Sequence, residues 1–442
     1  MKAQAGILES DDGAGAAAKL GAALDPLFAD QREREWVRAR LAALLGLVTD
    51  EPVMRTSAGV DRGESFTAWR RFLEAIAERR PLVMVVEDLH WADPVLLDFI
   101  DHLLATAGAV PLLVVATARP ELLERRPSWG GELVRLGPLS DTETARLTTM
   151  LLGHSLLPAE VQSLLLDRAG GNPLYAEEFV RLLTDRGLLV ADGATVRLAA
   201  DAEIPFPDTV QALIAARLDT LPAGAKDLLQ DAAVLGRVFW SGGLAAVSGR
   251  DADTIAAGLE QLIQRGLIRA APDSAVGGQR EYAFSHALVR DVAYAQLPRR
   301  VRAGRHRAAA EWLSGLADSR AVDLAELVAH HATSALDLAI ATHASIAELA
   351  ELRAPARRAL VLAGDRTIDL DAARALGYYT RACELWPAGD PAGPGSWSSW
   401  PTPPIRRPGT SRSRAPPWRR PSPSSPPRAT GSARPGRWSG WS

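Results

Sequence analysis

Two adjacent acids, Glu87 and Asp88, stand where metal-dependent chemistry could take place. They follow the apolar run at 81–86, which reads PLVMVV and is typical of a strand buried on both faces of a parallel sheet. Four apolar residues and then two acids match the Walker B pattern, in which one acid helps to hold Mg²⁺ and the next polarises the attacking water. The pair alone also fits a structural role, because acids often end buried strands. The longer string EDLHWAD is more specific.

A second apolar run ends in polar residues in the same way. The segment 111–117 reads PLLVVAT and continues into Ala118 and Arg119, and the intervening 94–106 has helical spacing of its leucines. Strand, helix and strand in this order predict a right-handed parallel crossover. Ligands bind at the carboxyl ends of such strands, so we expect Thr117 and Arg119 to lie near the two acids.

A glycine-rich turn follows further along the chain. Gly170, Gly171, Asn172 and Pro173 precede an apolar-periodic stretch, and proline is tolerated in the first turn of a helix. From these residues alone we predict a turn that starts a helix.

Four strings, in this order, resemble a known family. They are VVEDLHWADPVLLDFI, VVATARPELLERRPSWGG, GPLSDTETARL and RAGGNPLYAEEFVRLL. They resemble the signal-transduction ATPases of the STAND class, and more narrowly the AAA-type ATPase module attached to bacterial nucleotide cyclases and to large LuxR-type regulators. The similarity extends from about residue 2 to residue 387.

The resemblance assigns roles to the residues singled out above and implies ATP and Mg²⁺ as cofactors. Glu87 and Asp88 would be the Walker B acids and the metal and catalytic residues. Thr117 and Arg119 would form the sensor-1 region, with the arginine facing the γ-phosphate. Gly171, Asn172 and Pro173 would match the GxP-type motif, in which the proline packs on the adenine.

The phosphate-binding motif of this family is missing from the sequence. A P-loop needs GxxxxGK[ST], and the chain has only three lysines, Lys2, Lys19 and Lys226. Neither Lys19 nor Lys226 has the required glycines, hydroxyl residue and preceding strand, and 14–24 fits a helix better. In the family the first residues of this chain lie downstream of the P-loop. We therefore expect a chain that starts inside the ATPase domain and binds ATP weakly or not at all.

The middle of the chain predicts short helices and hairpins. Residues 188–198 indicate a hairpin around Asp192-Gly193, and Asp208 could cap a helix through Leu218. The further elements expected are helices at 223–235, 241–248 and 251–266 and two strands within 267–284. Helices followed by a hairpin resemble a winged helix, a unit that follows the ATPase in STAND proteins.

Two residue patterns bear on what this unit could bind. The helix expected at 251–265 carries one arginine and three acids, which argues against a face that tracks nucleic-acid phosphates. His286 lies in the string FSHALVRDVAY, which resembles one in the cyclase-linked relatives. It could lie near the nucleotide, as a winged-helix histidine often does in STAND proteins, or it could be a buried structural histidine.

Residues 301–387 have a helical pattern rich in Ala and Arg. The segment 377–387 resembles the second half of a tetratricopeptide repeat, which implies a protein partner. His330, His331 and His343 could suggest a metal, but no carboxylate or cysteine pattern completes a site. We therefore expect these histidines on a helix surface.

Composition excludes several classes of protein. The 442 residues include 50 basic and 53 acidic side chains, a net charge of −3, which argues against a strongly basic nucleic-acid binder. The single cysteine, Cys383, excludes a disulfide framework. No apolar run approaches the ~20 residues of a membrane-spanning helix, so we expect a cytoplasmic protein with no membrane partner.

The segment 391–442 has a different composition. It contains nine Arg and no Asp, Glu or Lys, and it shows no apolar period. A shifted reading frame in GC-rich DNA would explain this change. A disordered tail and a basic proline-rich binding arm are the alternatives.

Together these patterns predict an α/β fold that becomes mainly α-helical. It comprises an incomplete P-loop-type parallel-sheet ATPase core, a winged-helix unit, a helical tetratricopeptide-like region and a disordered tail. The expected boundaries are 1–187 for the partial ATPase domain, 188–300 for the helical lid and winged-helix-like unit, 301–390 for the helical repeats and 391–442 for the tail.

Three functions remain open from sequence. The first is a fragment of an ATP-binding and ATP-hydrolysing regulator that couples nucleotide state to partner binding, with a cyclase or transcription-regulator domain attached in the parent. The second is a non-catalytic scaffold with a degenerate ATPase fold. The third is a truncated and frameshifted gene product with no independent function.

Overall fold

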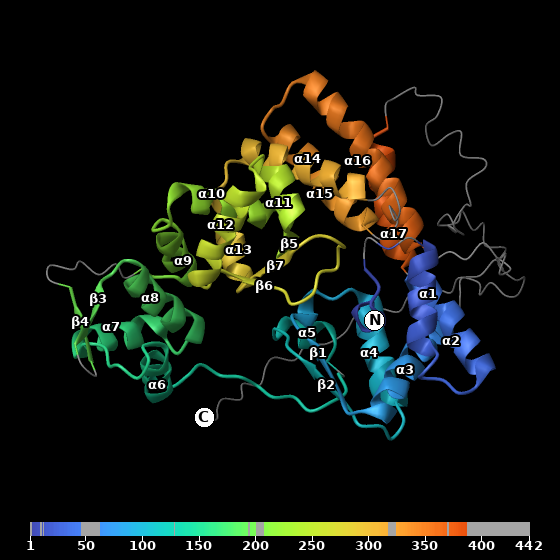
Figure 1. The fold of residues 1–442 in the computed structure, drawn as a ribbon, viewed down its shortest axis with the longest axis horizontal. Coiled ribbons are helices and arrows are strands. Elements are labelled where there is room, and N and C mark those ends of the chain that lie inside the picture. Colours follow the sequence, from blue (N-terminus) through green and yellow to red (C-terminus); the bar gives the residue numbers. More distant parts are fainter. Residues whose placement is uncertain are drawn as a thin grey trace, which may run out of the picture. The chain divides into compact units, whose positions relative to one another are not determined.

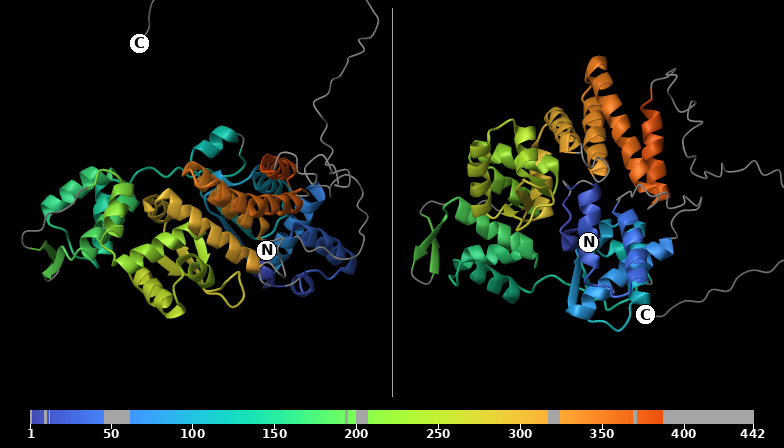
Figure 2. Two further views of the ribbon diagram at one scale, coloured as in Figure 1. Left: turned by 90° about the horizontal axis from the view of Figure 1, so that it is seen from above. Right: turned by 45° about the vertical axis from the view of Figure 1, so that its right-hand side comes forward.

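The computed structural model describes residues 2–8, 11, 13–45, 62–127, 129–192, 195–199, 207–316, 324–368 and 371–386. The predictions for 391–442 lie outside these residues. Figures 1 and 2 show the described elements along the chain.

The first part of the chain places helices beside a pair of parallel strands. After the short turn η1 (Ala3–Ala5), the elements are α1 (Gly13–Leu24), α2 (Gln31–Leu44), α3 (Arg62–Arg79), β1 (Leu82–Val86), η2 (Leu89–Trp91), α4 (Pro94–Thr106), β2 (Leu112–Ala116) and α5 (Glu121–Arg125). β1 and β2 are parallel, with Leu82 opposite Leu112 and Val86 opposite Ala116. The strand–helix–strand unit and the helix at 14–24 are confirmed.

Local signals explain where α4 begins and which face it buries. The carboxylate of Asp93 accepts the backbone N–H of Leu96, and Pro94 occupies the first turn. Leu97, Ile100 and Leu103 recur at helical spacing and are buried. They pack in one core with residues of α1, α2 and α3, so α4 holds the strand pair against this helical layer.

The prediction that the strands are buried on both faces is wrong. Met84 and Val114 pack against the helical core. On the opposite face the exposed fractions are 58% for Val83, 60% for Val85, 56% for Leu113 and 42% for Val115. The reason is that the described helices cover one side of the pair. Parallel sheets are ordinarily covered on both faces, so this face has the composition of an interior and the exposure of a surface.

The next part forms a small helical unit with a hairpin. It contains α6 (Asp141–Leu151), α7 (Ala159–Ala169), α8 (Pro173–Asp185), β3 (Leu189–Asp192), β4 (Thr195–Leu198) and α9 (Val210–Leu218). A reciprocal capping box between Ser140 and Glu143 starts α6. β3 and β4 pair antiparallel, which confirms the predicted hairpin.

The predicted cap of α9 is wrong by one residue. Thr209 accepts the backbone N–H of Ala212 and is the N-cap. Asp208 instead forms an ion pair with Arg168. Both side chains are good caps, and the ion pair draws Asp208 away from the helix terminus.

In the third part of the chain, helices pack around a three-stranded antiparallel sheet. It comprises α10 (Ala223–Leu235), β5 (Val238–Trp240), α11 (Ser241–Ser248), α12 (Ala252–Gln264), β6 (Ile268–Ala270), β7 (Glu281–Phe284) and α13 (Ala287–Gln296). The strand order is β5-β7-β6. Leu228, Phe239 and Phe284 belong to its buried core, and the helices and strands expected from sequence are present.

The last described elements are four long helices. These are α14 (Arg299–Leu316), α15 (Ala325–Ala341), α16 (Ile346–Thr367) and α17 (Ala372–Glu384). Each packs side by side with the next (Figures 1 and 2). Their shared core is rich in alanine, and small side chains allow close approach of helices. None of the helices in the described part of the chain has the length and hydropathy of a membrane-spanning segment.

Candidate functional site

Backbone hydrogen bonds join the carboxyl ends of β1 and β2. The N–H of Thr117 donates to the carbonyl of Val86 (2.9 Å), and the N–H of Leu89 donates to the carbonyl of Thr117 (2.8 Å). The side-chain hydroxyl of Thr117 also accepts the N–H of Asp88 (3.0 Å). Thr117 therefore holds the segment that carries the two acids.

Asp88 has an unusual backbone conformation. Its φ is +54°, in the left-handed region, which non-glycine residues adopt at a cost and which often marks functional sites. The residue lies two positions beyond the end of β1 and directly before the turn η2. This conformation turns the chain sharply at the point where Glu87 and Asp88 are exposed to solvent.

Both carboxylates form ion pairs with the same arginine. The guanidinium of Arg237, beside β5, lies 2.9 Å from Asp88 Oδ2 and 3.3 Å from Glu87 Oε2. All three side chains are at least one-third exposed, so this pairing is worth at most about 1 kcal/mol. The two acids therefore act as one anionic site, and Arg237 can leave it easily.

Arg119 lies two residues beyond Thr117 and faces an aromatic ring. Its guanidinium carbon is 5.9 Å from the ring centre of Trp91, within the range of a cation–π contact. Trp91 belongs to η2, the turn that follows the two acids. The sensor-1 candidates, Thr117 and Arg119, thus both contact the segment that begins at Asp88.

Gly171, Asn172 and Pro173 form the start of α8. Gly171 has a φ of +75°, and a Cβ there would overlap the carbonyl oxygen of Leu139. Its own carbonyl accepts the N–H of Leu139 (2.9 Å). Asn172 caps α8 by accepting the N–H of Leu174 (3.0 Å), and Pro173 occupies the first turn. The turn that starts a helix, predicted from the residues alone, is confirmed.

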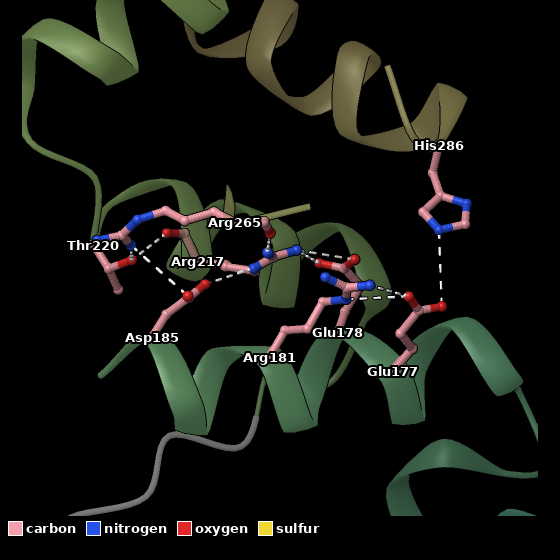
Figure 3. Close-up of polar contacts among 8 residues, drawn as sticks. All are labelled: Glu177, Glu178, Arg181, Asp185, Arg217, Thr220, Arg265 and His286. Carbon is pink, nitrogen blue, oxygen red and sulfur yellow. Dashed lines mark hydrogen bonds and ion pairs between the residues drawn. The ribbon is translucent and has the colours of Figure 1, made fainter. Parts of the chain in front are cut away.

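His286 lies at the start of α13 and faces α8. Its Nε2 is 3.8 Å from Oε2 of Glu177, and Glu177 also forms an ion pair with Arg181 (2.7 Å). Figure 3 shows the ring of His286 pointing to Glu177 on α8. The histidine is partly exposed, so the alternative of a buried structural histidine is wrong.

A buried ionic network next to His286 was not anticipated from the sequence. Arg217 of α9 donates to Glu178 (2.9 Å) and to Asp185 (2.8 Å), both on α8. It also donates to the carbonyl of Arg265 at the end of α12. Figure 3 shows Arg217 between these partners. Arg217 and Glu178 are each 1% exposed. Arg217 therefore links α9 to α8 and to the end of α12 from a desolvated position.

A sequence signal for this network exists in hindsight. Arg217 is the one charged residue in the α9 sequence VQALIAARL, and long charged side chains are almost never fully buried unless they are paired. Its partner could not be read from the spacing, because Glu178 is 39 residues away.

The structure thus places the site residues in two groups. Glu87, Asp88 and Thr117 meet at the end of the strand pair, with Arg119 on the following turn. Gly171, Asn172 and Pro173 form the start of α8, and His286 faces the same helix.

The first lysine candidate for phosphate binding has another partner. Lys19 pairs with Asp11 at 2.7 Å and lies within α1. Lys226 pairs with Asp219 at 2.7 Å. Lys226 lies within α10.

Comparisons with known proteins reveal partial similarities. Residues 140–197 match a family model described as a domain of unknown function (DUF8739). An uncharacterized protein of Rhizobium meliloti (strain 1021) is 27% identical over 257 residues, which are 56% of this chain and 24% of that protein. This chain therefore spans about a quarter of the length of that relative.

A solved structure is distantly similar to this chain. It is the crystal structure of a STAND protein with a tetratricopeptide repeat sensor from Pyrococcus horikoshii, with 14% sequence identity and a TM-score of 0.42. The similarity covers 82% of this chain and 52% of that chain.

Proposed function

We propose that this chain is part of an ATP-dependent signalling regulator of the STAND class. The observation that carries the proposal is the meeting of Glu87, Asp88 and Thr117 at the carboxyl ends of two parallel strands, where such sheets bind ligands. The choice of ATP as the ligand comes from the four sequence strings that resemble this family.

Each group would have a distinct task at a nucleotide. Glu87 and Asp88 offer carboxylate oxygens, which Mg²⁺ prefers, and Thr117 fixes the backbone that carries them. Arg119 would turn from Trp91 towards the γ-phosphate. Pro173 would pack on the adenine, with His286 close to the same helix. Bound Mg²⁺ would supply charge neutralisation for phosphoryl transfer to water.

The remaining units would relay nucleotide state. The order α10-β5-α11-α12-β6-β7 and the strand order β5-β7-β6 support a winged helix. Arg237 lies directly before β5 and pairs with both acids, so a metal ion at the acids would have to displace it. We propose this exchange as the link between nucleotide and winged helix, with α14–α17 as the contact for a protein partner. A cyclase or transcription-regulator domain would be the effector.

A non-catalytic scaffold is the second candidate. The absence of GxxxxGK[ST] from the sequence favours it, because the amides and the lysine of that motif hold the phosphates. In a scaffold the ion pairs of Arg237 would be permanent, and Asp88 would have no ligand other than this arginine.

Calorimetric titration with Mg-ATP distinguishes the two. For the regulator we expect a weak Kd, about 0.1–1 mM, equivalent to about −4 to −5.5 kcal/mol, and at least a fivefold loss in Asp88→Asn. Glu121→Gln is the matched control, because this exposed acid lies on α5, the helix that contacts η2. Equal affinity in Asp88→Asn and wild type would contradict the assigned site and favour the scaffold. Micromolar affinity in wild type would overturn the expectation that the missing motif limits binding.

A further inference from the structure

Three histidines from two helices of the last unit come together. His306 lies on α14, and His330 and His331 are neighbours on α15. The ligand nitrogens of all three lie within 4.8 Å of one another. The sequence prediction of a helix surface is wrong for His331, which is buried with His306. His330 is exposed. The error has a physical origin, because the imidazole that meets His331 comes from 25 residues away.

The contacts of His306 direct one ring nitrogen at its neighbour. Its Nε2 lies 2.9 Å from the hydroxyl of Tyr294, which can accept the Nε2–H. That tautomer leaves the lone pair of His306 Nδ1 facing His331 Nδ1 at 2.9 Å. Two imidazole nitrogens at this separation need a proton or a cation between them, because their lone pairs repel. A metal-bound histidine commonly uses its second ring nitrogen in the same way, in a hydrogen bond that fixes the ring.

We propose that His306, His330 and His331 bind one transition-metal ion of the zinc class and that this ion clamps α14 to α15. Three imidazoles are an established zinc ligand set, with Zn–N distances of about 2.0–2.1 Å and a fourth position open. Tetrahedral geometry then places ligand nitrogens about 3.3 Å apart. The buried pair is already close to this spacing, and exposed His330 can rotate to complete it.

The protonation state of the buried pair suits a metal. Burial lowers the pKa of His306 to about 3 and that of His331 to about 3. These two buried imidazoles are therefore neutral at pH 7, which is the form that binds metals.

Two arginines near the cluster oppose a dication. Arg290 and Arg302 lie 4.9 Å and 4.6 Å from the ring centre of Tyr294, and their charges help to lower the pKa of His306. Both also bind backbone carbonyls, Arg290 that of Ala233 and Arg302 that of Leu297. Since no carboxylate among the described residues completes this metal-ligand cluster, we expect a site weaker than a cysteine zinc finger.

Solvent reaches the cluster through His330. A groove beside it is lined by residues of α15, α16 and α17, namely Glu326, His330, Thr333, Leu360, Arg374 and Tyr378. Glu326 in this groove is paired with Arg374 (2.6 Å). A water molecule from the groove is therefore the fourth ligand that we expect.

The test uses the whole untagged chain after removal of metals with EDTA. Zinc chloride is titrated against a chromophoric chelator, and cobalt chloride reports the geometry by its visible absorption. We expect one zinc per chain, tetrahedral cobalt bands and a higher melting temperature with zinc. His330→Ala should lower zinc affinity at least tenfold, and Tyr294→Phe, which removes the hydrogen bond to His306, about tenfold.

His343→Ala is the matched control, because His343 lies just beyond α15 and outside the cluster. It should bind zinc as the wild type does. His330 is exposed, so its replacement leaves the fold intact, and circular dichroism checks this. Absence of stoichiometric zinc binding by the wild type, or undiminished binding by His330→Ala, would overturn the proposal.

Discussion

Replacing Arg217 with methionine should strongly destabilise the contact between α8 and α9. Arg217 and Glu178 are both fully buried and lie 2.9 Å apart. Methionine fills much of the same volume but leaves the Glu178 carboxylate in the interior without its counterion. Removing one partner of a buried ion pair costs about 3–5 kcal/mol. For a folding unit of 150–250 residues, this corresponds to a fall of about 6–20 °C in melting temperature.

Arg181→Met is the matched control on the same face of α8. Its partner Glu177 is partly exposed, as is Arg181 itself, so its loss should cost less than about 1 kcal/mol. Thermal unfolding by circular dichroism measures both variants. Hydrogen exchange of 173–185 and 210–218 tests whether the loss is confined to the two helices.

A double variant separates the charge from the packing. In Arg217→Met with Glu178→Leu the uncompensated carboxylate is gone, and apolar replacements of buried pairs are often neutral or stabilising. We expect it to regain at least half of the stability lost in Arg217→Met. A single variant within about 1 kcal/mol of wild type, or a double variant less stable than the single one, would refute the reasoning.

Three further predictions concern other parts of the chain. Gly171→Ala should lower the free energy of unfolding by about 1–3 kcal/mol, since its Cβ would overlap Leu139. Gly170→Ala, whose Cβ would meet open space, should lower it less. Equal urea midpoints of the two variants would contradict this. Val85→Ser should reduce the binding of a hydrophobic dye and the self-association of the chain, and it should change the free energy of unfolding by about 0.5 kcal/mol or less. Val114→Ser, on the packed face, should lower the free energy of unfolding. Equal melting temperatures of the two variants would be the opposing result. The folded pKa of His331, about 3, lies below its ordinary 6.5, so stability falls as pH drops through 6.5. Between pH 7 and pH 5 in EDTA, the free energy of unfolding of the wild type should fall by about 2 kcal/mol more than that of His331→Asn. Parallel curves of stability against pH for the two proteins would refute this prediction.

Short-range signals in the sequence predicted much of the fold. The strands β1 and β2, the helix between them and the hairpin at 189–198 follow from apolar runs and turn residues. Their prediction succeeded because caps and periodicity act over a few residues. The junction of Asp88 with Thr117 followed from parallel topology, which brings like ends of strands to one edge.

Features that depend on distant partners could not be predicted. The open face at Val83 and Val85 depends on which helices cover the strands, which the strand sequence does not encode. The ion pair of Arg217 with Glu178 and the meeting of His306 with His331 join residues 39 and 25 positions apart on separate helices. Asp208 and Thr209 are adjacent and both are favourable N-caps for α9. The ion pair of Asp208 with Arg168 leaves Thr209 as the cap.

The most direct test of the central claim is the binding of Mn²⁺, as a paramagnetic substitute for Mg²⁺, in the presence of ATP. Electron paramagnetic resonance measures the free ion with wild type, Asp88→Asn and Glu121→Gln. The account predicts that wild type and Glu121→Gln deplete the free signal equally and that Asp88→Asn depletes it much less. Equal depletion by all three proteins would contradict the assignment of the acids beside Thr117 as the metal site.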